Sequence, residues 1–367
     1  MWILTAAVAL AVAAVMASRF RRPAPRLRPV EALAILAVVT MAVTDLATIW
    51  QPMRDLGIYL LAGQHYLHGG QVYLSSALTV GPDDPKNLPF LYPPLTLPFF
   101  GALSVLPERL AQVVWLVGSV GLGMLALRWI GLPWRWAALA LGWPPFFIGL
   151  WVGNIAVPAL ALFAMGPAIG SGLVLGAIFK SYTGISALWL MRERRWVDIL
   201  VGVAALAILV LATLPLTGLD LWPKWIASLG FYQASQPNLP GLYGFGLPRY
   251  VPYPVYFVAA AVAVIAALMV RGREGLARFG TATIVASPSL FGHGLLVAVP
   301  SLLSLRSPWL WLAVGLVSTP QGPQWLLAIG VIVLSWVVPA MRRDPKSATA
   351  EEPLHPLGAN GEIWPAA

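Results

Sequence analysis

The chain has 367 residues, of which 59% are hydrophobic and only 10% are charged, and its mean hydropathy is +0.78. Because a soluble domain carries about 25% charged residues, this composition excludes a secreted or cytosolic enzyme, a nucleic-acid-binding domain and a disordered protein. The net charge of +9 is typical of a membrane protein whose arginines gather in cytoplasmic loops. The absence of cysteine excludes disulfides, thiolate catalysis, iron–sulfur clusters and cysteine-ligated zinc.

Apolar segments separated by charged or proline-rich breaks predict an all-α polytopic membrane protein with about 11–13 transmembrane helices. A full crossing needs about 20 apolar residues. Several segments are shorter, so we expect some half-helices that end inside the protein. The expected spans are residues 2–18, 31–50, 93–106, 110–129, 134–151, 154–169, 171–190, 197–215, 252–270, 277–292, 294–305, 308–320 and 323–340.

The distribution of basic residues predicts the orientation of these spans. No basic residue precedes the first span, whereas Arg19, Arg21, Arg22, Arg26 and Arg28 follow it. A cleaved signal peptide carries its charge on the other side, so we expect a true span whose C-terminal end faces the cytoplasm. Alternation of the spans then leaves most of the 23 basic residues on the cytoplasmic side, in agreement with the positive-inside rule.

This topology predicts the organisation of the chain. Residues 1–30 form an extra N-terminal span with a basic cytoplasmic loop, and residues 31–343 form the main transmembrane domain. Residues 344–367, rich in Pro, Ala and Glu, are expected to be a disordered cytoplasmic tail. Two segments, 51–92 and 216–251, face the outside, so any active site is expected in these loops and at the adjoining helix ends.

Asp55 is the first candidate for chemistry, because ionisable residues close to a membrane are costly and mark functional sites. It follows the second span and directly precedes residues 56–68, whose apolar side chains share one helical face. That spacing is typical of a short helix lying in the outer interface. An aspartate there would act as a general base toward a hydroxyl group. Alternatively, Asp55 caps the N-terminus of that helix.

Two basic side chains are further candidates. His293 follows a Pro, Ser and Gly-containing break at the outer end of a span, on the same side as Asp55. It would bind a phosphate or orient a base, or else pack as a polar residue with one hydrogen-bond partner. Lys180 falls within the span 171–190, where a lysine costs about 2.5–3.5 kcal/mol on insertion scales. It would bind an anionic group such as a lipid phosphate, or else snorkel to the interface.

The sequence predicts neither a metal site nor a cofactor. His65 and His68 have the i, i+3 spacing of metal ligands, but no third ligand is evident. Asp83 and Asp84 lie between two prolines, a pattern that favours a turn.

The candidate residues belong to a series of short motifs. In chain order these are Asp55-Leu56-Gly57-Ile58-Tyr59, Gly69-Gly70-Gln71-Val72-Tyr73, Phe90-Leu91-Tyr92-Pro93-Pro94-Leu95, Leu106-Pro107, Gly153-Asn154, Gly172 to Lys180, Arg192–Trp196 and Ser287-Pro288 through His293. The ordered set covers residues 31–300 and resembles glycosyltransferase family 87, polytopic enzymes with a GT-C-type fold. The sequence departs from the family pattern at Gly294, where the family has a second histidine, and at Phe291, where it has tryptophan.

The resemblance implies an inverting glycosyltransferase of a bacterial cytoplasmic (inner) membrane, with its active site facing outward. The implied donor is a polyprenyl-phosphate sugar (mannose or arabinofuranose), and the implied acceptor is a glycolipid or polysaccharide. In this family Asp55 would be the general base and His293 its partner at the donor phosphate, without an essential metal. Tyr59, Tyr92, Lys180 and Arg249 would bind donor or acceptor.

Two other function classes stay open at this point. A transporter or lipid flippase would have a similar composition, although such proteins commonly show internal repeats and we find no convincing repeat here. A membrane scaffold with an inactive site is the other alternative, suggested by Gly294 in place of a histidine.

Overall fold

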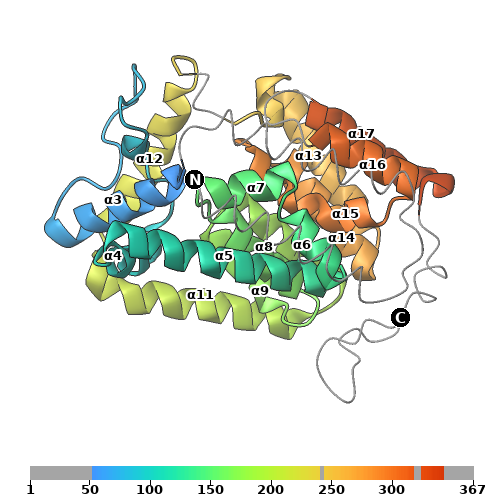
Figure 1. Ribbon diagram of the computed structural model, residues 1–367, viewed down its shortest axis with the longest axis horizontal. Helices are drawn as coiled ribbons and strands as arrows, with labels where there is room; N and C mark the ends of the chain where they lie inside the picture. The colour runs from blue at the N-terminus through green and yellow to red at the C-terminus, as the bar shows by residue number, and fades with distance from the viewer. Residues whose placement is uncertain (1–51, 240–243, 318–323, 343–367) are drawn as a thin grey trace.

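The computed structural model describes residues 52–239, 244–317 and 324–342 (Figure 1). Within these ranges the secondary structure is helical, and the only β-type pairing is a single bridge between Leu305 and Arg342. The all-α prediction is therefore confirmed for the described residues. The expected spans 2–18 and 31–50 and the expected tail 344–367 lie outside them.

Some expected spans are occupied by one helix each. These helices are α5 (Glu108–Ile130), α8 (Ala156–Met165), α11 (Trp196–Thr217), α13 (Tyr253–Leu268), α16 (Ser307–Val317) and α17 (Gln324–Val337). Other expected spans are broken into shorter pieces. These are η2 (Pro94–Thr96) with α4 (Leu97–Ser104); α6 (Trp134–Ala140) with α7 (Pro144–Trp151); α9 (Ser171–Leu175) with η3 (Gly176–Ile178), η4 (Ser181–Ala187) and α10 (Leu188–Arg192); and η6 (Gly292–Ala298) with α15 (Val299–Leu303). The expected span 277–292 corresponds to one helix, α14 (Gly272–Val285), which begins and ends earlier than expected.

The breaks have local causes. Pro144 and Pro145 have no backbone N–H to continue a helix from α6, but they fit the first turn of a new one, and α7 begins there. In the expected span 171–190 the backbone is extended at Lys180, with φ −147° and ψ 110°. Lys180 therefore lies in a gap between η3 and η4, and the prediction of one continuous helix through it is wrong.

The two expected external segments contain helices as well. The first holds α3 (Arg54–His68) and η1 (Pro85–Asn87), and the second holds α12 (Leu221–Ser235) and η5 (Leu247–Arg249). The amphipathic stretch 56–68 correctly predicted α3. The 15-residue α12 was expected as loop, because polar residues interrupt its apolar run. Two of them, Ser228 and Ser235, are buried and accept hydrogen bonds from the backbone N–H groups of Leu74 and Leu78, at 3.3 and 2.8 Å.

Among the described residues, two helices are long and apolar enough to cross a membrane. They are α5, with 23 residues, and α11, with 22. In α11 only 6% of the most apolar stretch is buried, so most of this helix is an exposed or partly exposed apolar surface. The other apolar helices have 10–17 residues. Polytopic membrane character and the GT-C-type fold therefore remain predictions.

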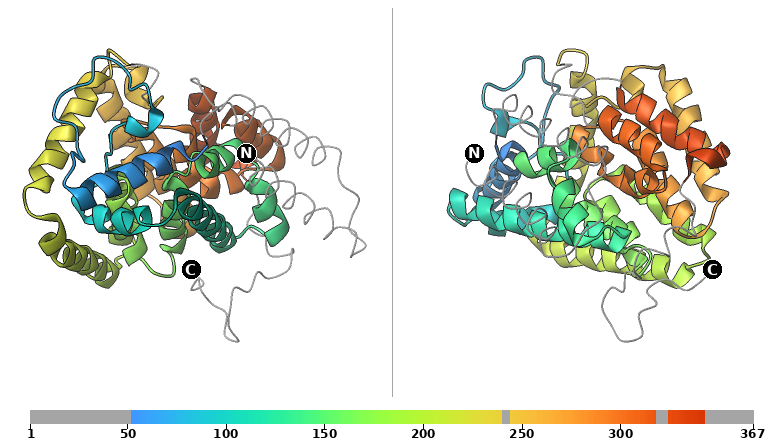
Figure 2. Two further views of the ribbon diagram at one scale, coloured as in Figure 1. Left: turned by 60° about the vertical axis from the view of Figure 1, so that its left-hand side comes forward. Right: turned by 45° about the vertical axis from the view of Figure 1, so that its right-hand side comes forward.

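The first and last helices of the described chain lie at opposite ends of the molecule (Figures 1 and 2). At one end α3 packs on α4, and at the other α16 packs on α17. Between them, α7 and α8 pack against η6. An aromatic cluster beneath α3 includes the rings of Tyr59, Phe90, Phe100 and Trp115, whose centroids lie 4.9–6.3 Å from that of Tyr59. This cluster fixes the position of α3.

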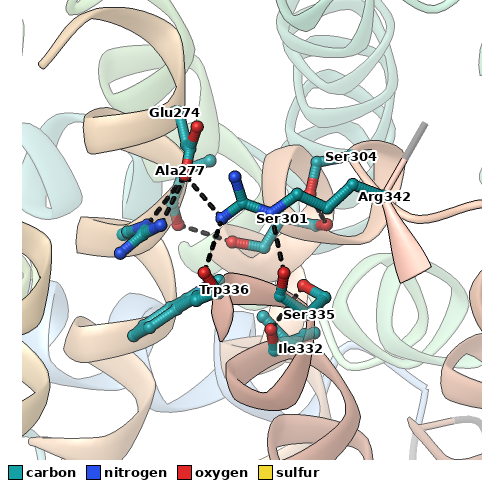
Figure 3. Close-up of polar contacts among 9 residues, drawn as sticks. Glu274, Ala277, Ser301, Ser304, Ile332, Ser335, Trp336 and Arg342 are labelled. Carbon is teal, nitrogen blue, oxygen red and sulfur yellow. Dashed lines mark hydrogen bonds and ion pairs between the residues drawn. The ribbon is translucent and has the colours of Figure 1, made fainter. Parts of the chain in front are cut away.

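Arg342 ties the end of the described chain to α14 (Figure 3). It follows the last short helix, η7 (Pro339–Met341). Its guanidinium donates to Glu274 at 2.6 Å and to the carbonyl oxygen of Ser335 at 2.7 Å. Arg278 donates to the same carboxylate at 2.5 Å, and its guanidinium lies over the ring of Trp336. Glu274 thus joins α14 to the end of α17 through two arginines.

Candidate active site

The N-terminus of α3 is held by the turn between α7 and α8. The backbone N–H groups of Met53 and Asp55 donate to the carbonyl oxygens of Trp151 and Val152, at 2.7 and 2.8 Å. The N-cap residue is Met53, and no side chain caps the helix. The alternative role of Asp55 as a helix cap is therefore wrong. Its side chain is turned to a tertiary contact instead.

Asp55 is 7% exposed, and its carboxylate has a donor at each oxygen. Asn154 Nδ2 donates to Oδ2 at 2.5 Å, and Arg54 Nε donates to Oδ1 at 2.9 Å. Asn154 Oδ1 in turn accepts from the N–H of Ala156, the first residue of α8, at 2.8 Å. Because one amide group bridges the two elements, the carboxylate has a defined orientation relative to α8.

Tyrosine hydroxyls extend this polar group. The hydroxyls of Tyr59 and Tyr92 are 3.0 Å apart, and Tyr73 donates to the carbonyl oxygen of Tyr92 at 2.9 Å. The N–H of Ile155 donates to the Tyr59 hydroxyl at 3.4 Å. Burial raises the pKa of Tyr59, and its neighbours Tyr92 and Asp55 raise it further, so the phenol stays protonated at neutral pH. Tyr59 is only 2% exposed, whereas Tyr92 is partly exposed.

A second group of residues forms a pocket between α8, α9 and η6. Its lining includes the polar residues Lys180, Thr183 and His293 and the glycines Gly172, Gly176 and Gly294. The Thr183 hydroxyl donates to the carbonyl oxygen of Lys180 at 2.6 Å, which holds the backbone turn that presents Lys180. The structure therefore brings together Lys180 and His293, two side chains that the sequence singled out separately.

His293 is enclosed within the protein. It is 3% exposed, and its ring stacks on Phe291 with centroids 5.7 Å apart and planes at 7°. Among the described residues its buried Nδ1 has no hydrogen-bond partner, so the expectation of a packed histidine with one partner is not met at this atom. Burial lowers the pKa of His293, and the positive charges of Lys180 and Arg54 lower it further, so the ring is uncharged at neutral pH. A neutral imidazole beside these cations can donate a hydrogen bond to an anionic ligand.

The other candidates lie apart from this pocket. Arg249 is exposed in η5. The segment before it lies against residues 287–290, and the N–H of Phe245 donates to the carbonyl oxygen of Leu290 at 2.6 Å. His65 Nδ1 lies 2.8 Å from the carbonyl oxygen of Gln71. Asp84 accepts from the N–H of Lys86 at 2.9 Å, which confirms the predicted turn. Within the described ranges no three His, Cys, Asp or Glu side chains are grouped as metal ligands.

Sequence reasoning gave no chemical role to Asn154. Its signal was a short Gly-Asn motif directly before a helix, a place where asparagine often bonds to the backbone two residues on. That signal predicts the contact with Ala156. The contact with Asp55 depends on a tertiary approach across 99 positions, and no local pattern predicts it.

The sequence model of glycosyltransferase family 87 matches residues 90–298, more than half of the chain. The chain belongs to this family. The matched region includes Asn154, Lys180 and His293. No curated protein and no solved structure matches the chain.

Family membership makes the protein a glycosyltransferase, which acts with a sugar donor and a glycan acceptor. Of the function classes that the sequence left open, family membership supports the enzyme. Asp55 precedes the matched residues, so its link to them is the hydrogen bond to Asn154. The two apolar helices α5 and α11 agree with an association with membranes.

Proposed function

We propose that this family 87 enzyme moves mannose or arabinofuranose from a polyprenyl-phosphate donor to a glycolipid or polysaccharide acceptor, with inversion at the anomeric carbon. The observation that carries the proposal is the pocket lined by Lys180 and by His293, whose buried Nδ1 has no hydrogen-bond partner within the described ranges. Such a pocket suits a desolvated phosphate group, because a cation and a hydrogen-bonding side chain line it. The donor lipid and both sugars are the ones implied by the family resemblance.

The reaction needs one proton removed and one bond exchanged. Asp55 accepts the proton of the acceptor hydroxyl, and the hydroxyl oxygen forms a bond to the anomeric carbon. The bond from that carbon to the phosphate oxygen breaks, and polyprenyl phosphate leaves with the electron pair. A single displacement on the face opposite the leaving group inverts the configuration. The proton ends on Asp55 and then passes to water.

The protein contributes positioning and charge to this step. Lys180 compensates the charge that grows on the departing phosphate, and the neutral imidazole of His293 donates a hydrogen bond to it, a stabilisation that is strong in a site closed to water. The donors on Asp55, Arg54 and Asn154, orient its carboxylate toward one direction of attack. The leaving group is already a stable anion, so the scheme includes no metal ion.

The lipid donor also accounts for the hydrophobic character of the chain. The exposed apolar surface of α11 and the apolar α5 would face lipid, and the polyprenyl chain would lie between helices within reach of the pocket. The positive-inside rule favours a site on the outer face of a bacterial cytoplasmic membrane. The protein would then be a multi-pass enzyme of cell-envelope biosynthesis.

The test is transfer of radiolabel by the purified full-length enzyme in detergent. Polyprenyl-phosphate mannose and polyprenyl-phosphate arabinofuranose are offered separately, with a glycolipid extract as acceptor. We expect label in the acceptor with one of the two donors, and the same rate with a chelator present. The proposed donor would be overturned if neither lipid donor transferred label to the acceptor, or if a nucleotide sugar transferred it instead. Lipid movement in proteoliposomes without sugar transfer would favour a flippase.

A further inference from the structure

The amide group of Asn154 links the carboxylate of Asp55 to the first residue of α8. Its nitrogen is 2.5 Å from Asp55 Oδ2, and its oxygen accepts the N–H of Ala156 at 2.8 Å. The contact with a backbone N–H fixes which end of the amide is oxygen, because that end must accept. The amide nitrogen is therefore directed at Asp55 as a donor.

The turn that carries Asn154 has little freedom to move. Gly153 has φ +70°, and a Cβ built on it would lie only 2.8 Å from Leu56 Cβ on α3. The carbonyl oxygen of Val152 accepts two N–H groups of α3, those of Asp55 and Leu56, at 2.8 and 3.3 Å. Asn154 itself is 6% exposed. Helix α3 and the turn consequently behave as one unit around the carboxylate.

The same turn leads directly into the wall of the phosphate pocket. Ala156, the backbone partner of Asn154, lines that pocket together with Lys180 and His293. One turn of helix earlier, Gly149 of α7 lies against His293, since a Cβ there would be 3.2 Å from the histidine Cβ. Asp55 does not line the pocket, and its carboxylate is linked to the pocket wall through the amide of Asn154.

We infer that Asn154 is a positioning residue, which orients the Asp55 carboxylate relative to the pocket of Lys180 and His293. The inference rests on the proposed role of Asp55 as general base. Asn154 donates to one carboxylate oxygen and leaves the other lone pairs of Asp55 to receive the acceptor proton. A residue that accepted from Ala156 but did not donate to Asp55 would keep the fold and lose this orientation.

The variant Asn154→Asp separates the two contacts of Asn154, with Ala156 and with Asp55. The new side chain has nearly the same size and still accepts the N–H of Ala156, but it replaces the donor by a second carboxylate. We expect kcat to fall about 10- to 100-fold at neutral pH, while the KM for the donor changes less than about threefold, because the pocket residues are intact. Two carboxylates in contact share a proton, so the acidic limb of the pH–rate profile moves to higher pH by about one unit or more.

The acidic limb has other contributors that stay constant in this comparison. The titratable or charged groups on α3 and on the elements packed against it near Asp55 are Arg54, Tyr59, Lys86 and Tyr92. His293 and Lys180 lie further away, where the charge of Arg54 still acts on His293. Lys86 is paired with Glu108 at 2.7 Å. None of these residues changes in the variant. A shift of the limb is therefore attributable to position 154.

Asp84→Ala is the matched control, because Asp84 makes the same kind of bond, to the N–H of Lys86 two residues on, without touching Asp55. We expect it to keep kcat and the pH profile. If Asn154 has only a structural role, Asn154→Asp also keeps kcat and the pH profile, and Asn154→Ala lowers thermal stability without changing either. That result would overturn the inference. The proposed function fails separately, if Asp55→Asn keeps its activity. An inactive Asp55→Asn beside an unchanged Asn154→Asp defeats only the role of Asn154.

Discussion

The side-chain amide of Asn154 donates a 2.5 Å hydrogen bond to the carboxylate of Asp55, 99 positions earlier in the chain. Asn154 lies inside the residues that match glycosyltransferase family 87, and Asp55 lies before them. The contact thus connects the family-matched part of the molecule to an acidic residue that is buried among donors. A buried carboxylate is a costly element of a fold, and one linked through a hydrogen bond to the wall of a pocket is a candidate for proton transfer.

Asp55→Asn should abolish sugar transfer. The substitution keeps the size of the side chain but removes the proton acceptor, and a general base contributes about 10²–10⁴-fold to rate. Initial rates with the labelled donor measure the loss, and Asp220→Asn is the control. Asp220 is another aspartate of the expected external segments, exposed and paired with Lys224 at 2.9 Å. Rates that fall equally in both variants, or in neither, would count against Asp55 as the base.

Lys180→Gln should weaken binding of the donor. A charged hydrogen bond contributes about 1.5–3 kcal/mol, so removing the charge should raise the KM for the polyprenyl-phosphate sugar about 10- to 100-fold. Inhibition by polyprenyl phosphate, the expected product, should weaken in parallel. Lys224→Gln removes an exposed external lysine and should leave both constants unchanged. An unaltered KM in Lys180→Gln would exclude Lys180 from the phosphate site.

The sequence predicted the local features of this site better than its assembly. The spacing of apolar residues in 56–68 predicted α3. Residues 134–151 were expected as one span, but the helix is broken before Pro144, which has no N–H donor. Lys180 was expected inside a continuous helix, because its neighbours are apolar, whereas the backbone is extended there. The meeting of Lys180 with His293 and of Asn154 with Asp55 depends on how helices pack, and composition and spacing carry little information on packing.

Glu274→Gln should lower thermal stability in a pH-dependent way. Burial by itself would raise the pKa of Glu274, but the hydrogen bonds and charges of Arg278 and Arg342 outweigh it and lower the pKa below its usual range. The stabilisation is therefore present at neutral pH, above the pKa of the unfolded chain, and is lost as the pH falls through the lower pKa of the folded protein. The carboxylate is 42% exposed, so we expect about 1 kcal/mol or less.

The measurement for this prediction is the melting temperature in detergent between pH 7 and pH 4. The difference between the wild type and Glu274→Gln should be largest at pH 7 and shrink toward acid. Glu108→Gln serves as a comparison, because Glu108 makes one ion pair, to Lys86, and its side chain is 55% exposed. A difference that grew toward acid would contradict the assigned direction of the pKa.

Gly153→Ala should lower the rate of sugar transfer more than the same substitution at another glycine with a positive φ. At φ +70° any side chain is strained by about 1–2 kcal/mol, and here the added Cβ would also press on Leu56 at 2.8 Å. Gly69→Ala provides the matched case, since Gly69 has φ +74° but nothing within 4 Å of an added Cβ. Both variants carry the backbone strain, and only Gly153→Ala displaces α3 from the turn. We therefore expect sugar transfer to fall at least about tenfold in Gly153→Ala and to stay near the wild-type rate in Gly69→Ala. Equal activities in the two variants would mean that the approach of α3 to this turn does not position Asp55.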